Sequence, residues 1–157
     1  MDNWEEVINI ISYPKNNNQI DILKGIQIDD PKVFIPWDIS NKDIEVFFHN
    51  CSLSRITNNY YAIYNTKLFG TLICNVGLHF DNILKRIEFF RNDYTDLQKS
   101  YDEFQTIFET KFGKPTRKIG NPINFDSCEW SISNNIVIYH HVMDRFGLEE
   151  HMYIERI

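Results

Sequence analysis

The strongest constraint on the fold is the strict alternation of apolar and other residues between positions 72 and 80. The apolar side of the alternation consists of Leu72, Cys74, Val76, Leu78 and Phe80. Successive side chains of a β-strand point to opposite faces, so this pattern predicts a strand with one buried face. Asp81-Asn82 follows as a turn, and residues 83–90 are expected to form the antiparallel partner. A chain with this hairpin is expected to contain an antiparallel sheet.

The clearest helix is predicted over residues 95–112. Aromatic and apolar side chains recur there on one helical face, and Gly113 and Pro115 supply the residues that end a helix. The segment from Thr95 to Gln98 has the pattern of a capping box, which satisfies the free backbone N–H groups of a first turn. This helix divides the chain into two parts that are both rich in strand patterns.

Shorter helices and further strands fill the rest of the chain. Ser40 is expected to cap a helix over residues 41–50, and residues 3–12 also show helical spacing. Asparagine pairs at 58–59 and 134–135 mark hairpin turns, because Asn tolerates positive φ. The additional strands are predicted at residues 20–28, 33–37, 52–57, 60–64, 124–133, 136–143 and 150–157.

These elements predict an α+β fold. With 157 residues, of which 43% are hydrophobic, the chain can bury its own core and is expected to form a single domain over residues 1–157. Both structural halves, about 33–90 and 91–157, show a helix followed by several antiparallel strands. We therefore expect an antiparallel sheet, or sheets, of about six to eight strands with two or three helices packed on one side.

Composition narrows the class of protein. The first residues are acidic, unlike an export signal, and the longest apolar runs are about half the length of a membrane helix. A soluble, cytoplasmic protein without a membrane partner is expected. Cys51, Cys74 and Cys128 lack a CxxC spacing and suit reduced structural thiols. The net charge of −6 disfavours direct binding to nucleic acid and favours a basic protein partner.

The sequence contains no nucleotide-binding, hydrolase or metalloprotease motif, so no catalytic residue, cofactor or metal site is predicted. The alternative is a small enzyme or ligand-binding protein with a histidine-containing pocket, built from His79, His140 or His151. His140 and His141 are adjacent on one predicted strand and should point to opposite faces, whereas His79 and His151 could approach across the sheet. Cys128 could be a nucleophile near His140, but its alternation with apolar residues favours a buried thiol.

Acidic turn residues and tyrosines are the candidate partner-binding residues. Turns leave acidic side chains free to reach outward, and aromatic side chains dominate many protein interfaces. Tyr60 and Tyr61 are consecutive on a predicted strand, so at least one should face outward, and Trp130 and Tyr139 could extend an aromatic surface. The candidates are Asp29, Asp30, Asp144, Glu149, Glu150, Tyr60, Tyr61 and Tyr64.

Three segments between about residues 40 and 157 also carry a family resemblance. They are the strand pair Leu72–Phe90, the helix end Lys111-Phe112-Gly113-Lys114-Pro115-Thr116 and the hairpin segment Trp130-Ser131-Ile132. Together they resemble the helix-plus-meander units of β-lactamase-inhibitor-like binding proteins and of small bacterial immunity proteins. The resemblance implies a non-enzymatic protein-binding module. Without an export signal, it implies an intracellular immunity protein that neutralises a cognate bacterial toxin, for example a nuclease. A scaffold that forms a homodimer through an exposed sheet edge is a third possibility.

Overall fold

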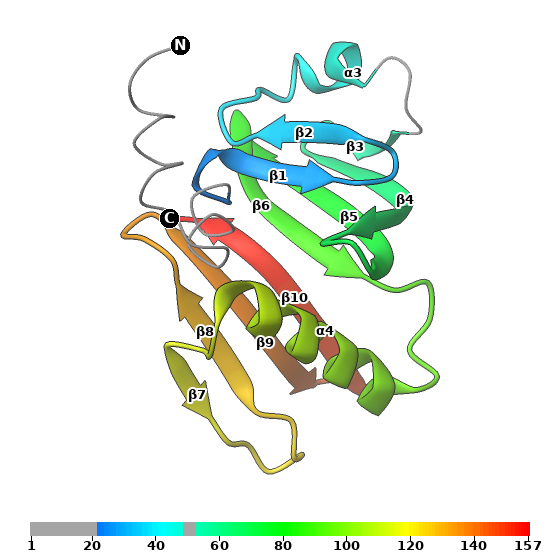
Figure 1. The fold of residues 1–157 in the computed structure, drawn as a ribbon. Helices are drawn as coiled ribbons and strands as arrows, with labels where there is room; N and C mark the ends of the chain where they lie inside the picture. The colour runs from blue at the N-terminus through cyan, green and yellow to red at the C-terminus, as the bar shows by residue number, and fades with distance from the viewer. Residues whose placement is uncertain (1–21, 49–52) are drawn as a thin grey trace.

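The computed structural model describes residues 22–48 and 53–157, which form two antiparallel sheets and their helices (Figure 1). The helix predicted over residues 3–12 lies outside the described residues. The larger sheet has eight strands in the order β3-β4-β5-β6-β10-β9-β8-β7. These strands are β3 (Ser54–Thr57), β4 (Tyr60–Leu68), β5 (Leu72–Asp81), β6 (Ile83–Phe90), β7 (Arg117–Ile119), β8 (Ser127–Ser131), β9 (Ile136–Asp144) and β10 (Leu148–Arg156). The predicted α+β fold with an antiparallel sheet of six to eight strands is confirmed.

The eight-stranded sheet consists of two four-stranded meanders. Strands β3 to β6 are consecutive neighbours, and so are β7 to β10. The meanders join where β10 pairs with β6, which places Met152 opposite Phe89. Each meander follows a helix, α3 (Ile44–Phe47) or α4 (Leu97–Phe112). The two halves therefore share the helix-plus-meander plan expected from the sequence.

Helix α4 and the smaller sheet cover one face of the eight-stranded sheet (Figure 1). The smaller sheet pairs β1 (Gly25–Ile28) with β2 (Val33–Pro36). Under this layer, the five apolar side chains of the β5 alternation are buried as predicted. They join a buried cluster that includes Ile28 of β1, Phe104 and Phe108 of α4, and Ile154 of β10. The two halves therefore share a hydrophobic core.

The start of α4 differs from the sequence prediction. Its N-cap is Asp96, whose carboxylate accepts a hydrogen bond from the backbone N–H of Lys99 at 3.0 Å. The hydroxyl of Thr95 instead donates to Asp93, so the predicted capping box is wrong. An aspartate is an equally good N-cap and adds a negative charge at the positive end of the helix dipole. The helix ends as predicted at Gly113, which has a φ of 83°.

The helix predicted over residues 41–50 is a single turn, α3, within the described residues. The hydroxyl of Ser40 does accept from the N–H of Asp43 at 3.2 Å, as expected of a cap. However, Ser40 also bridges to Ile83 of the large sheet, and the Asn41 N–H donates to the Asn82 carbonyl. Pairing with the sheet has overridden the helical spacing of this segment.

Both asparagine pairs lie in hairpin turns as predicted, between β3 and β4 and between β8 and β9. Neither pair has a positive φ, which is found instead at Asn82 in the β5–β6 turn, at 65°. The strand predicted over residues 124–133 begins later, as β8, and the short edge strand β7 was not predicted. Its three residues, all exposed, lack the alternation that identifies a half-buried strand.

Candidate functional site

The large sheet has one face that no other described element covers, opposite α4 and the small sheet, and we call it the outer face. Side chains alternate between the two faces along each strand, so the residues between the buried apolar positions lie on the outer face. Pairing then sets these residues side by side, so that Tyr153 lies opposite both Glu88 and Tyr139. The outer face includes Tyr60 and Tyr64 of β4, His79 of β5, Arg86, Glu88 and Phe90 of β6, Tyr139 and His141 of β9, and His151, Tyr153 and Glu155 of β10.

One cluster on the outer face joins Tyr60, His79 and Glu88. The rings of Tyr60 and His79 stack with their centroids 4.3 Å apart. The hydroxyl of Tyr60 donates to Oε1 of Glu88 at 3.1 Å, and this oxygen also lies 3.3 Å from Nε2 of His79. Gly77 makes room for the contact, because a Cβ there would lie 2.8 Å from Oε1 of Glu88. The three side chains are therefore held in one arrangement over the strand.

The protonation of this cluster follows from its contacts. Burial acts to raise the pKa of Glu88, but the hydrogen bond and charge of His79 and the hydrogen bond of Tyr60 outweigh it, so the pKa lies below its usual value. Burial and the nearby Glu88 carboxylate raise the pKa of Tyr60. Near neutral pH the outer face therefore presents a carboxylate held by a neutral phenol.

A second cluster on the outer face is built around Arg86. Its guanidinium lies 4.3 Å from the centroid of the Tyr153 ring and donates to Glu155 at 2.9 Å. The rings of Tyr153 and Tyr139 lie 5.2 Å apart, centroid to centroid. Arginine over a tyrosine ring is a cation–π contact that fixes both side chains. The centre of the outer face is thus ordered before any partner binds.

His141 and His151 continue the outer face toward the β9–β10 turn. Their rings lie 5.1 Å apart, centroid to centroid, on directly paired positions of the two strands. Nε2 of His151 lies 3.5 Å from Oε2 of Glu149, yet it forms no hydrogen bond with any described residue. Burial and, next, the neighbouring His151 lower the pKa of His141 below its ordinary value of 6.5. The His141 ring is therefore held neutral in the folded protein.

This depressed pKa predicts that the protein loses stability in mild acid. Between the folded pKa of His141 and 6.5, the unfolded chain binds more protons than the folded chain, so the free energy of unfolding falls as pH decreases through this window. Urea unfolding at several pH values from 5 to 8 should show this slope, and His141→Gln should reduce it. Equal slopes in the parent and His141→Gln would show that His141 does not contribute.

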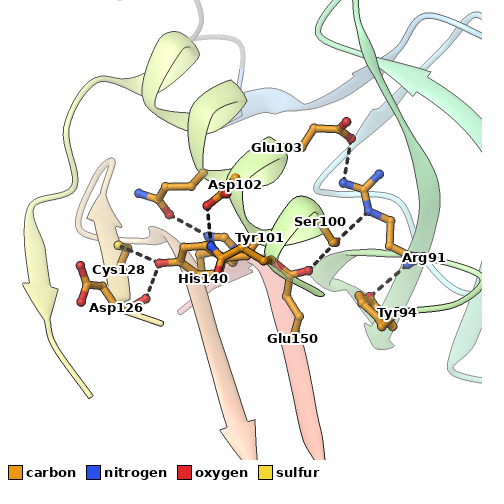
Figure 2. Close-up of polar contacts among 12 residues, drawn as sticks. Arg91, Tyr94, Ser100, Tyr101, Asp102, Glu103, Asp126, Cys128, His140 and Glu150 are labelled. Atoms are coloured by element: carbon orange, nitrogen blue, oxygen red, sulfur yellow. Dashed lines mark hydrogen bonds and ion pairs between the residues drawn. The ribbon is translucent and has the colours of Figure 1, made fainter. Parts of the chain in front are cut away.

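A buried polar network lies under α4, on the opposite side of the sheet from the outer face (Figure 2). His140 is 0% exposed; its Nε2 lies 2.6 Å from Oε2 of Glu150 and its Nδ1 lies 2.7 Å from Oε1 of Gln105. The hydroxyl of Ser100 donates to the other oxygen of Glu150 at 2.6 Å. Tyr101 stacks on the imidazole with ring centroids 4.2 Å apart. The network fastens α4 to β9 and β10.

Oxygen atoms face both ring nitrogens of His140. If the ring is protonated, its two N–H groups donate to Gln105 and to Glu150. If the ring is neutral, the side-chain amide of Gln105 is flipped, so that its NH2 group donates to Nδ1. In either form Nε2–H of His140 donates to Glu150. The amide nitrogen of Gln105 has no hydrogen-bond partner among the described residues. Glu150 is therefore the acceptor on which the buried imidazole depends.

Arg91 connects this network to the surface (Figure 2). Its Nε donates to the Ser100 hydroxyl at 3.1 Å, and its Nη2 donates to Glu103 at 2.8 Å. The guanidinium also lies 4.0 Å from the centroid of the Phe104 ring. A cavity of about 370 Å³ adjoins these side chains, with Lys99 also in its wall. Because Arg91 is paired with Glu103 of α4 and its Nη1 donates to the Ile73 carbonyl of β5, we interpret it as a link between α4 and the sheet.

The structure separates the histidines considered for a pocket. His140 and His141 point to opposite faces, as predicted, and His140 is fully enclosed. His79 and His151 both lie on the outer face, where each lowers the pKa of the intervening Glu88. No group of three or more His, Cys, Asp or Glu side chains within residues 22–48 and 53–157 is placed to bind a metal ion.

The predicted buried thiol is observed at Cys128, which is 3% exposed, and burial raises its pKa. Cys74 is also buried, and burial raises its pKa to about 12. Both thiols therefore remain protonated at neutral pH and suit the structural role expected of them. Cys51 lies outside the described residues.

The acidic candidates occupy two separate turns. Asp29 and Asp30 lie at the β1–β2 turn, and Asp144 and Glu149 lie at the ends of the strands that meet in the β9–β10 turn. The expectation that Glu150 reaches out from a turn is wrong, because its side chain is only 1% exposed. Alternation along β10 turns it into the core, where the buried imidazole is its partner. Charge reversal at Glu150 would therefore disturb the fold itself.

The tyrosine candidates also divide between the two faces. Tyr60 and Tyr61 point to opposite faces as predicted; Tyr60 belongs to the outer face, whereas Tyr61 is 3% exposed in the core and unavailable to a partner. Tyr64 is 43% exposed on the outer face and touches Phe90. Trp130, considered for an aromatic surface, is 1% exposed and packs in the core.

Tyr153 and Arg86 are outer-face residues that the sequence prediction did not identify. The sequence did indicate that Tyr153 faces outward, because it lies between the apolar residues Met152 and Ile154 of the strand predicted over residues 150–157. The contact between Arg86 and Tyr153 depends on the pairing of β6 with β10. These strands are separated in the sequence by α4 and three other strands, so no local pattern indicates their contact.

No protein-family model matches this chain, and neither a curated protein nor a solved structure is significantly similar to it. In the described part of the chain, no helix is long and apolar enough to cross a membrane.

Proposed function

We propose that this chain is a non-enzymatic protein-binding module, and specifically an immunity protein that neutralises a cognate bacterial toxin. The outer face is its binding surface. The observation that carries the proposal is the ordered array of tyrosine, histidine and arginine side chains on a sheet face that no other described element covers.

Composition and rigidity support a binding role for the outer face. Tyrosine and arginine are enriched among the residues that contribute most to protein interfaces. Here Arg86, Tyr153 and Tyr139 are held against one another on β-strands, so little side-chain freedom is lost when a partner binds. The five longest strands are neighbours, β4-β5-β6-β10-β9. With strands about 4.8 Å apart, they span roughly 700 Å², close to the roughly 800 Å² that each partner contributes to a standard interface.

The net charge of the chain supports a basic partner. The net charge of −6 attracts a basic protein over long range and speeds association. On the outer face itself, Arg86 is paired with Glu155, so the aromatic centre is close to neutral. A nuclease toxin fits this charge pattern, because its own active site must attract phosphate.

The test uses the protein encoded by the adjoining gene. If that gene encodes a toxin, producing this chain in the same cells should restore growth, and the two proteins should copurify in equal amounts. A matched strain carrying the toxin with an empty vector provides the control. If cells are not protected and the purified proteins do not bind, the immunity role is wrong.

A further inference from the structure

The β9–β10 hairpin extends beyond its neighbours in the large sheet. β9 and β10 pair continuously from Ile136 opposite Arg156 to Asp144 opposite Leu148. By contrast, β8 pairs with β9 only as far as His140, and β6 pairs with β10 only as far as Met152. We call residues 141–151 the arm, because they form a two-stranded ribbon flanked by neither β8 nor β6. Its turn lies near the first turn of α4 (Figure 1).

The base of the arm is fixed to the rest of the protein. Val142 packs with Tyr101 of α4 and with Phe125 in a small buried cluster. Glu150, on the other strand of the arm, is held by His140 and Ser100. These contacts leave only the end of the arm without tertiary support, so the direction in which the arm points is set by the fold.

The end of the arm is apolar, which is unusual for a hairpin turn. Phe146 is 97% exposed, and Met143 and Leu148 beside it are 37% and 45% exposed. Hairpin turns usually contain Gly, Asn, Asp or Ser. One exposed apolar residue by itself would be ordinary on a protein surface. Three such residues lie within six positions at the end of a supported arm. Alternation places Met143 on the outer-face side of the arm, with His141 and Tyr139, and Leu148 on the opposite side, with Glu150. Phe146, in the turn between them, therefore has an exposed apolar neighbour on each side of the arm, and we call these three residues the patch.

The charges around the patch indicate the kind of surface that it fits. Arg145 donates to Glu149 at 2.9 Å, so these two charges largely cancel. Asp144 then gives the end of the arm one net negative charge beside the Phe146 ring. A pocket complementary to this patch is apolar inside and basic at its rim.

We propose that Phe146 is the anchor of the protein interface, and that the arm inserts its ring into an apolar, basic-rimmed pocket of the partner protein. This inference rests on the proposed function and extends the binding surface from the outer face to the arm. A rigid aromatic ring at the end of an arm with fixed direction buries a large apolar area and loses little conformational freedom on binding.

The experiment measures binding kinetics between the purified toxin from the adjoining gene and three forms of this chain: the parent, Phe146→Ser and Val46→Ser. Val46 is the matched control, since it is 74% exposed and lies on α3, away from the arm. Phe146→Ser should weaken binding at least tenfold, mainly through faster dissociation. Val46→Ser should bind within twofold of the parent. Thermal unfolding should be close to that of the parent in both variants, because the two side chains are 97% and 74% exposed.

The outcomes separate this inference from the proposed function. If the parent does not bind the toxin, the proposed function fails, and the anchor fails with it. If the parent binds and Phe146→Ser binds equally well, the anchor is wrong but the immunity role stands. The anchor is also wrong if, without toxin, the parent is dimeric and Phe146→Ser monomeric, since a second copy would then occupy the patch. The anchor is wrong, too, if the parent sediments with phosphatidylglycerol vesicles and Phe146→Ser does not, since the ring would then bind a lipid surface.

Discussion

Replacing Glu150 by Ala is expected to lower the free energy of unfolding by about 3 to 5 kcal/mol, because it removes one partner of a buried polar pair and leaves the other. The side chains of His140 and Glu150 are 0% and 1% exposed, so bulk water does not reach the imidazole in the folded protein. The Ser100 hydroxyl would lose its acceptor at the same time. For a chain of this size, such a loss corresponds to a fall in the unfolding midpoint of roughly 10 °C.

Two matched variants make the Glu150 experiment specific. Glu149→Ala changes the same residue type one position earlier, where the side chain is 38% exposed, and should leave the midpoint close to that of the parent. The double variant His140→Leu/Glu150→Leu removes both partners and should lose less stability than Glu150→Ala alone, because the buried imidazole is no longer left without its acceptor. If Glu150→Ala unfolds at the same temperature as Glu149→Ala, the network does not support the fold as described.

Much of the fold could be predicted from the sequence, because its strands alternate and its main helix has clear ends. The alternation of β5 indicated which side chains would be buried, and Gly113 marked the end of α4. The helix-plus-meander plan of both halves also followed from local patterns. These features depend on residues that are close together in the sequence, and the spacing of apolar residues reports on such local structure.

Two of the errors occur where contacts with another strand outweigh local preference. The segment after Ser40 has helical spacing, but pairing with Ile83 restricts the helix to one turn. Glu150 follows a turn and has the composition of a solvated site, yet it faces the core. Nothing nearby in the sequence indicates that His140, on the adjacent strand, would supply a buried partner. Most carboxylates stay in contact with water, but a carboxylate can be buried where an opposite charge or a hydrogen-bonding group is its partner.

The candidate site was only partly predictable for the same reason. Alternation correctly placed Tyr60 and Tyr61 on opposite faces, and His140 and His141 likewise. The outer face as a surface, however, is made by the pairing of β6 with β10, which joins the two meanders. Its central contact, Arg86 over Tyr153, therefore appears only once the sheet order is known.

Tyr153→Ser tests whether the outer face binds the partner. Tyr153 lies at the centre of this face between Arg86 and Tyr139, the position where interface residues contribute most. Its truncation should cost about 2 kcal/mol or more of binding free energy, which is roughly a 30-fold loss of affinity. Tyr153→Phe retains the ring over which Arg86 lies and should lose much less.

The measurement is the dissociation constant of the toxin complex for the parent, Tyr153→Ser, Tyr153→Phe and the control Val46→Ser, which changes an exposed apolar residue on α3. Thermal unfolding of each variant establishes that it is folded at the temperature of the binding experiment. We expect Tyr153→Ser alone to lose about 30-fold in affinity for the toxin. If folded Tyr153→Ser binds the toxin as tightly as the parent does, the outer face is not the binding surface.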